Sequence, residues 1–227
     1  METQTLDRST ARLTGLLYLA MAVVAVPGFM IIRPMIFDPD DPAATVAHLV
    51  ENETLARVGI VLELGVVVTQ VLVALWFVKL FHRTDAFAAA SLGVFGAFNA
   101  ITILGSAACL AAALDAALTT PFAADQGGAA QLMYLLSGQF WGVGATFFGL
   151  WLIPMGLLVL RARMPRALGW FVLAGGVAYL LSTLVTYLAP GATAVAEALP
   201  FIATIGEFWM IGWLIWYGVR QGPSAPR

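Results

Sequence analysis

The stretch "LPFIATIGEFWMIGWLIWYGVR", Leu199–Arg220, decides the fold class because it is apolar almost throughout and long enough to cross a bilayer. A hydrocarbon core about 30 Å thick needs about 20 helical residues at a rise of about 1.5 Å each. The stretch therefore predicts a membrane-spanning helix. Its exception is Glu207, a carboxylate inside the run, which a membrane helix retains for a structural or functional reason.

The composition of the whole chain agrees with a membrane protein. Of 227 residues, 61% are hydrophobic and 11% are charged, whereas soluble domains carry about 25% charged residues. Six long apolar runs occur, and they predict an all-α polytopic membrane bundle that forms a single integral membrane domain over residues 1–227. The predicted spans are Leu13–Ile32, Val58–Leu80, Ala86–Leu114, Gln139–Leu160, Leu168–Leu188 and Leu199–Val219.

The positions of lysine and arginine predict the orientation of these spans. With the N-terminus inside, nine of the eleven basic residues are cytoplasmic, and the remaining two, Arg33 and Arg57, lie outside. An excess of Lys and Arg marks cytoplasmic loops. Both termini are therefore predicted to be cytoplasmic, in a multi-pass protein of the inner or plasma membrane whose partner is the lipid bilayer. The net charge of −2 argues against a nucleic-acid partner.

The outer loops carry signals of their own. Asp41 followed by Pro42 is typical of a helix N-terminus. The segment "PAATVAHLVENE" then places Val46, Leu49 and Val50 on one side, which predicts a short amphipathic helix on the outer surface. The preceding acidic run, Asp38–Asp41, is interpreted as a turn and helix cap in preference to a cation site. An apolar patch in the second outer loop predicts another surface helix before the fourth span.

Polar or small residues at helical spacing form one stripe on each of the later spans. Lipid penalises an outward-facing polar stripe, so the stripes are expected to face the bundle interior. Glu63 and Glu207 lie about 8 and 12 Å below the outer starts of their spans, counted at about 1.5 Å per residue. We therefore predict an outward-facing polar pocket in the outer half of the bundle. Its candidate residues are Arg57, Glu63, Gln70, Asn99, Thr102, Gln139, Thr146 and Glu207.

The residues that common cofactors and catalytic centres require are absent from the sequence. The two histidines, His48 and His82, fall on opposite sides of the predicted membrane, and no Cys/His cluster exists. The single cysteine, Cys109, forms no intramolecular disulfide. No metal ligands, no cofactor and no catalytic residues are predicted.

Three functions remain open at this stage. The favoured one is a non-enzymatic membrane protein whose pocket binds a small molecule, a lipid headgroup or a proton. The second is an accessory or assembly subunit, in a homo- or hetero-oligomer, whose buried polar groups hold helices together. The third is an intramembrane enzyme that uses Glu63 and Glu207 as acid and base.

Four segments of the chain carry a resemblance to a known family. They are "GLLYLAMAVVAVPGFMIIRPMIF", "DDPAATVAHLVENETLARVGIVLEL", "GATFFGLWLIPMGLLVLRARMPRALGWFVLAGGVAYL" and "GEFWMIGWLIWYGV", with Arg57, Pro165, Gly169 and Glu207 in the matching positions. In these segments the chain resembles the bacterial membrane-protein family called domain of unknown function 4386, over almost its whole length. The resemblance implies a six-helix membrane protein and brings no established activity.

Overall fold

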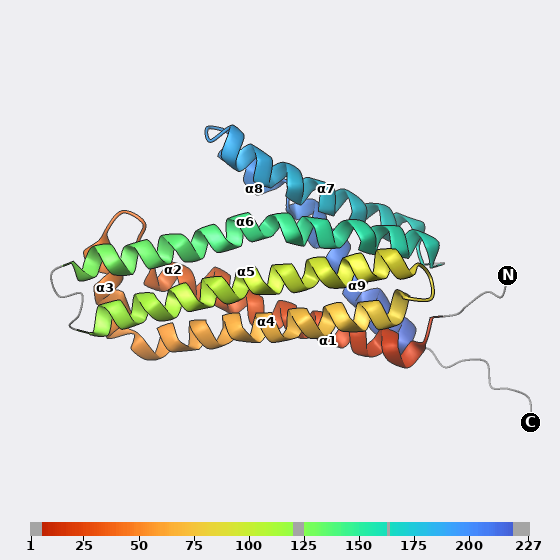
Figure 1. The fold of residues 1–227 in the computed structure, drawn as a ribbon, viewed down its shortest axis with the longest axis horizontal. Helices are drawn as coiled ribbons and strands as arrows, with labels where there is room; N and C mark the ends of the chain where they lie inside the picture. Colours follow the sequence, from red (N-terminus) through yellow and green to blue (C-terminus); the bar gives the residue numbers. More distant parts are fainter. Residues whose placement is uncertain (1–5, 120–124, 163, 220–227) are drawn as a thin grey trace, which may run out of the picture. The chain divides into compact units, whose positions relative to one another are not determined.

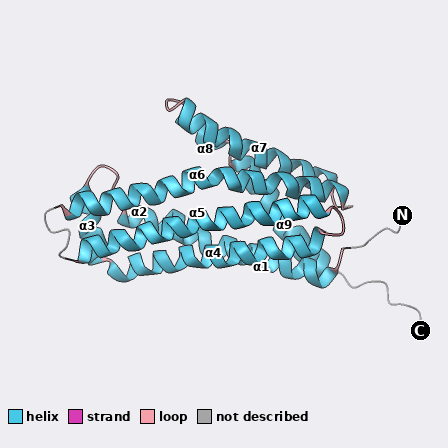
Figure 2. Cartoon of the chain, in the orientation of Figure 1, coloured by secondary structure: helices cyan, strands magenta, loops and turns pink. Residues whose placement is uncertain are grey.

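The computed structural model describes residues 6–119, 125–162 and 164–219, and within them every regular element is a helix (Figures 1 and 2). Six stretches are long and apolar enough to cross a membrane, which confirms the six predicted spans. They are Arg8–Ile36, Glu53–Phe81, Ala86–Leu118, Gln126–Arg161, Arg166–Leu188 and Thr193–Tyr217. The chain is thus a multi-pass membrane protein by the length and composition of its helices.

The first span is built from three consecutive helices: α1 (Arg8–Val26), the π-helix η1 (Pro27–Ile32) and α2 (Arg33–Ile36). Pro27 lacks a backbone N–H, which disturbs the regular α-helical ladder. In the wider turn that follows, the backbone N–H of Arg33 donates to the carbonyl oxygen of Gly28. The helix therefore continues past Ile32, the predicted end, and Arg33 belongs to the helix instead of the outer loop.

The predicted helix in the first connection is present as α3 (Pro42–Glu51). Asp41 caps it, since one carboxylate oxygen accepts from the N–H groups of Ala43 and Ala44 at 2.9 and 3.0 Å. The buried face includes Leu49 and the partly buried Val46, as predicted, and differs from the prediction at Thr45 and Val50. Thr45 and Leu49 are buried, whereas Val50 is 48% exposed. The interior position of Thr45 is satisfied because its hydroxyl lies 3.0 Å from Oε1 of Gln131 and 3.1 Å from the carbonyl oxygen of Asp38, either of which accepts its one hydrogen.

The next three helices are long: α4 (Glu53–Phe81), α5 (Ala86–Leu118) and α6 (Gln126–Arg161). The start of α6 corrects two predictions, because the helix begins at Gln126 and not at Gln139. The apolar patch that predicted a separate surface helix is the first part of α6 itself. Asp125 supports this early start by accepting from the N–H of Gly128 at 2.9 Å.

The chain ends with α7 (Arg166–Leu188), the short α8 (Thr193–Ala198) and α9 (Phe201–Val219). Its contacts divide it into two compact units. The first unit comprises Met1–Leu19, Val71–Ala97 and Ala145–Arg227, and the second comprises Ala20–Gln70 and Phe98–Gly144. Helices α1, α4, α5 and α6 contribute residues to both, so neither unit is one continuous segment. Each unit contains one of the two intramembrane glutamates.

Close helix contacts in the first unit depend on glycine. A Cβ on Gly149 would lie 2.8 Å from the carbonyl oxygen of Gly176, and one on Gly156 equally close to that of Gly169. Helices α6 and α7 therefore meet backbone to backbone, an arrangement that small residues permit in lipid. A similar approach joins α1 to α9, where a Cβ on Gly15 would lie 2.9 Å from Leu214 and Ile215.

Candidate polar sites

The second unit contains a buried ion pair between Arg33 of α2 and Glu63 of α4. The guanidinium Nη2 lies 3.0 Å from Glu63 Oε1, and the two side chains are 13% and 5% exposed. An arginine flanked by apolar residues on a spanning helix is costly unless it has a partner. Glu63 supplies the opposite charge, so the pair is neutral as a whole.

Two serines complete the contacts of the guanidinium. Arg33 Nη2 donates to Ser137 Oγ at 2.6 Å and lies 3.3 Å from Ser106 Oγ, while the two hydroxyl groups are 2.7 Å apart. Ser106 belongs to α5 and Ser137 to α6, and both are fully buried. A single guanidinium nitrogen therefore connects α2 to α4, α5 and α6.

An indole and a phenyl ring enclose this group further. Trp141, one turn after Ser137 on α6, donates from Nε1 to Glu63 Oε1 at 3.2 Å. The ring of Phe29 lies 5.1 Å from that of Trp141 and 5.6 Å from the guanidinium carbon of Arg33. We call Arg33, Glu63, Ser106, Ser137 and Trp141 the Arg33 site.

Several buried polar atoms near this site have no hydrogen-bond partner among the described residues. They are Nε of Arg33, Oε2 of Glu63, and both amide atoms of Gln70. An unsatisfied buried polar group costs about 1–3 kcal/mol. The combined cost of four such atoms approaches the whole free energy of unfolding of a typical protein, about 5–15 kcal/mol. Water or a bound molecule is therefore expected to hydrogen-bond to them.

Gln70 and Glu63 lie on the same face of α4. It follows Glu63 by seven residues, so the two side chains share a helix face about 10 Å apart along the axis. On α5, the buried Asn99 precedes Ser106 by the same seven residues. Because a short turn joins α4 to α5 and makes them antiparallel, Asn99 is expected at the level of Gln70.

The end of the second unit near α3 is closed by polar contacts. Gln131 of α6 donates from Nε2 to the carbonyl oxygens of Asp38 and Pro39 at 2.9 and 3.0 Å. Nδ1 of His48 on α3 lies 3.2 Å from the carbonyl oxygen of Ile36. Around them Leu49 and Tyr134 join an apolar cluster. The segment after Arg33 is thereby fixed to α3 and α6.

Glu207 in the first unit has a different setting. Its Oε1 accepts a hydrogen bond of 2.5 Å from the hydroxyl group of Tyr18 on α1. No lysine or arginine pairs with it among the described residues, and the side chain is half-buried. An ionised carboxylate at the centre of a spanning helix costs about 2.5–3.5 kcal/mol on insertion scales. The tyrosine hydroxyl offsets only part of that cost.

Aromatic rings surround Tyr18. It stacks on Trp151 with ring centroids 5.8 Å apart and meets Phe77 edge to face at 5.7 Å. Phe148 packs edge to face against both Trp151 and Tyr179. Trp151 is fully buried, and its Nε1 has no hydrogen-bond partner among the described residues. We call the following residues the Glu207 site: Glu207, Tyr18, Phe77, Phe148, Trp151 and Tyr179.

The remaining predicted pocket residues take other positions. Arg57 forms an exposed ion pair with Glu53, one helical turn away, at 2.7 Å. Thr102 is half-buried and donates to the carbonyl oxygen of Asn99 at 2.7 Å. Gln139 is exposed, and Thr146 is half-buried in the first unit. The ion pair described for Arg57 and the hydrogen bond described for Thr102 thus involve neither Glu63 nor Glu207.

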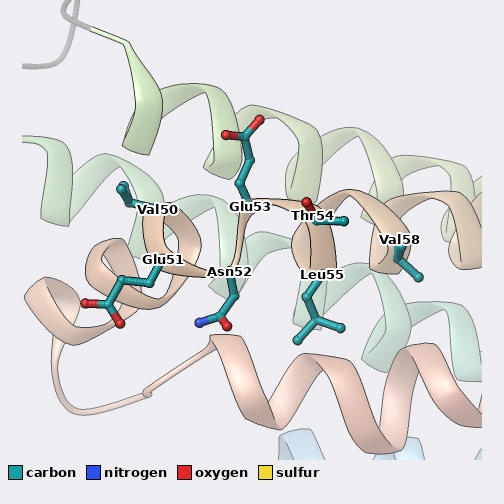
Figure 3. Close-up of a pocket in the computed structure, with 7 residues that line it drawn as sticks. All are labelled: Val50, Glu51, Asn52, Glu53, Thr54, Leu55 and Val58. Atoms are coloured by element: carbon teal, nitrogen blue, oxygen red, sulfur yellow. The ribbon is translucent and has the colours of Figure 1, made fainter.

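A surface hollow of about 430 Å³ lies at the junction of α3 and α4 (Figure 3). In the figure Glu51, Asn52 and Leu55 point to one side of the backbone and Glu53 to the other. The hollow is lined by Val50, Glu51, Asn52, Glu53, Thr54, Leu55 and Val58. None of the residues predicted from the sequence to form the polar pocket lines this hollow.

The acidic run before α3 serves the backbone, as interpreted from the sequence. Asp38 Oδ1 accepts from the N–H groups of Asp40 and Asp41 at 3.0 and 3.2 Å, and Asp41 caps α3. Among the residues that the structure describes, no group of three or more His, Cys, Asp or Glu side chains is arranged to hold a metal ion. The carboxylates of this run thus have a structural use.

The chain matches a known protein family. The family described as a domain of unknown function (DUF4386) matches residues 13–218, which includes all six spans. The chain belongs to the DUF4386 family. The matched residues include both the Arg33 site and the Glu207 site, so both lie inside the DUF4386 domain. No curated protein and no solved structure matches the chain.

Sequence reasoning missed Arg33, Ser137, Trp141 and Tyr18 as site residues. Arg33 was assigned to a loop because basic residues usually flank spans, although the apolar "PMIF" after it signals that the helix continues. On α6 the predicted pocket residues are Gln139 and Thr146, whereas in the structure Ser137 accepts from Arg33 and Trp141 donates to Glu63. Tyr18 gives no signal, because one tyrosine in an apolar run is common.

Proposed function

We propose that this DUF4386 protein is a membrane protein that binds a small, uncharged polar molecule at the Arg33 site. The observation that supports it most is the pair of unpartnered atoms on one buried ion pair: Nε of Arg33 donates and Oε2 of Glu63 accepts. A molecule with one acceptor beside one donor, such as an alcohol or an amide, satisfies both atoms.

The charge balance of the site favours a neutral occupant. The charges of Arg33 and Glu63 cancel, and the other members of the site carry hydroxyl or indole groups. An anion would gain from Arg33 but meet the free oxygen of Glu63, and an amine would meet the guanidinium. Two like charges r Å apart repel by about 332/(εr) kcal/mol, where ε is the dielectric constant. Where ε is low, this repulsion amounts to several kcal/mol at contact distance.

Gln70 extends the proposed site along α4. Its amide offers both a donor and an acceptor about 10 Å along the helix axis from Glu63. Asn99 adds a second amide on α5 at the level where Gln70 is expected. An elongated neutral molecule with polar groups at both ends fits this arrangement better than a compact one.

The experiment uses Trp141 as a reporter, since its indole N–H donates to the same carboxylate. The protein is labelled with 5-fluorotryptophan in nanodiscs, and the Trp141 signal is assigned with Trp141→Phe. It is titrated with four probes of similar shape: butyramide, butanol, butyrate and butylammonium. The amide and the alcohol are expected to shift the signal saturably, and the two ions are not.

Variants identify the carboxylate responsible. Glu63→Gln is expected to abolish the shift, and Glu53→Gln, which changes an exposed glutamate of the same helix, is expected to keep it. Gln70→Leu tests the second level and should weaken binding of hexane-1,6-diol more than that of butanol. Ordered water alone at the site, with no saturable shift by either neutral probe, would overturn the proposal.

A structural role is the second candidate, and one observation favours it. Arg33 joins four helices through a single nitrogen, which is a strong geometric constraint. A purely structural pair predicts that Glu63→Gln lowers the unfolding temperature clearly while no probe shifts Trp141. An enzyme with Glu63 and Glu207 as an acid/base pair has no supporting contact among the described residues. The sharing of one pocket by these two glutamates stays a prediction.

A further inference from the structure

Glu207 lies at the edge of the buried face of α9. Ala203, Met210 and Leu214 on that helix are buried, while Phe208 is 57% exposed. Glu207 lies between the buried residues and the exposed Phe208 around the helix, and it is half-buried. Its carboxyl group therefore borders the protein surface within a stretch that is apolar enough to span a membrane.

The basic groups of α1 and α7 lie far along their axes, and Lys79 of α4, two residues after Phe77, is exposed with its ammonium group over the ring of Trp76. Between Phe201 and Val219, α9 contains no lysine or arginine. Arg12 on α1 is about 9 Å along the axis from Tyr18, and Arg166 on α7 is about 20 Å from Tyr179. Tyr18 and Tyr179 are the titratable side chains that interact with Glu207 from α1 and α7. The carboxylate thus lacks a cationic partner among the described residues.

The rings beside the carboxylate select the kind of cation. Tyr18, Trp151, Phe148 and Tyr179 form a continuous set of ring contacts. Aromatic faces attract cations, most strongly when water is excluded. A hard metal ion needs several oxygen ligands, and Glu207 has one carboxylate and one phenol beside it. An organic cation with an apolar body matches a carboxylate set among rings and lipid.

We propose that the Glu207 site binds lipophilic organic cations, with the carboxylate of Glu207 as counter-ion and the half-buried rings of Phe148 and Tyr179 as its apolar wall. The site is independent of the Arg33 site, because the two carboxylates belong to different units and have different partners. Cation binding at the Glu207 site would not test the binding of a neutral molecule at the Arg33 site. If one of these two proposals fails, the other is unaffected.

The test compares two ions of the same shape and opposite charge. Tetraphenylphosphonium and tetraphenylborate are each titrated against the full chain in nanodiscs by equilibrium dialysis, with empty nanodiscs as background. The cation is expected to bind saturably and the anion to bind at background level. Equal binding of both ions would assign the interaction to apolar surface alone and overturn the proposal.

Variants separate the carboxylate from its surroundings. Glu207→Gln is expected to weaken binding of the cation at least tenfold, whereas Glu197→Gln, an exposed glutamate on α8, keeps it. Tyr18→Phe removes the hydrogen bond but not the charge, so the cation binds at least as tightly. If Glu207→Gln does not fold, Glu207→Asp serves instead, with a several-fold loss expected. Unchanged affinity in the folded Glu207 variant would overturn the proposal.

Discussion

Glu63 and Glu207 are the same residue in similarly apolar helices, yet their neighbours differ in charge. Glu63 is enclosed and accepts from Arg33 and Trp141. Glu207 is half-buried and accepts from the neutral hydroxyl group of Tyr18. One carboxylate therefore has a cationic partner, and the other has none among the residues that the structure describes. Two acidic residues in one membrane protein need not share a purpose.

The largest loss of unfolding free energy should follow the replacement of Arg33, in the Arg33 site. Arg33→Met leaves Glu63 buried without a counter-charge, and breaking a buried pair on one side costs about 3–5 kcal/mol. The unfolding free energy is measured by denaturant titration in detergent. Arg57→Met, which breaks the exposed pair with Glu53, is the matched control and should cost about 0–1 kcal/mol.

A double variant sharpens this result. Arg33→Met combined with Glu63→Leu removes both charges, and apolar replacement of a buried pair is often neutral. We expect it to recover most of the stability lost in Arg33→Met. Equal losses in the single and double variants would mean that the hydrogen bonds of Arg33 to the serines matter more than the charge of Glu63.

The Glu207 site should be sensitive to the spacing of α1 and α9. Gly15→Ala adds a methyl group that would lie 2.9 Å from Leu214 and Ile215, one turn from Tyr18. Overpacking of this kind costs about 1–3 kcal/mol. Gly212→Ala is the control, because no atom lies within 4 Å of its added Cβ. Equal stability of the two variants would contradict the close approach of these helices.

Loss of the tyrosine hydroxyl should have a smaller effect. Tyr18→Phe removes one hydrogen bond to Glu207, worth about 0.5–1.5 kcal/mol in unfolding free energy. Tyr179→Phe is the control, since the structure describes ring contacts for Tyr179 and a hydroxyl bond for Tyr18. A loss as large as that of Arg33→Met would show that Glu207 depends on its partner as strongly as Glu63 does.

The smallest effect concerns Asp7, a carboxylate outside the spans. Hydrogen bonds from the hydroxyl groups of Thr10 and Ser9 lower its pKa from 3.8 to about 2. Its stabilising contribution is present above the unfolded pKa of 3.8 and is lost as the pH falls through about 2. Unfolding temperatures between pH 5 and pH 2 should fall slightly more for the wild type than for Asp7→Asn. Parallel curves would contradict a stabilising contribution from these hydrogen bonds.

The six spans were predictable because each is a long apolar run, a property of local composition. The cap of α3 was predictable for the same reason, since Asp41 and Pro42 act on their own helix. Arg33, Ser106 and Ser137 come together from three helices, and no local pattern contains that information. The face that α6 turns to Arg33 depends on its rotation, which Gln139 and Thr146 alone did not reveal.

The π-helix η1 carries a consequence for insertions and deletions in this segment. Its turn holds one residue more than an α-helical turn would, and Arg33 follows it directly. Deleting one residue between Pro27 and Ile32 would turn the wide turn into a regular α-helical one, which absorbs the lost residue locally and leaves Arg33 directed toward Glu63. Deleting one residue within α1 has no such turn to absorb it, and it would rotate the part before the deletion by about 100° relative to Arg33. The wide turn therefore tolerates a change of length that the regular helix beside it does not.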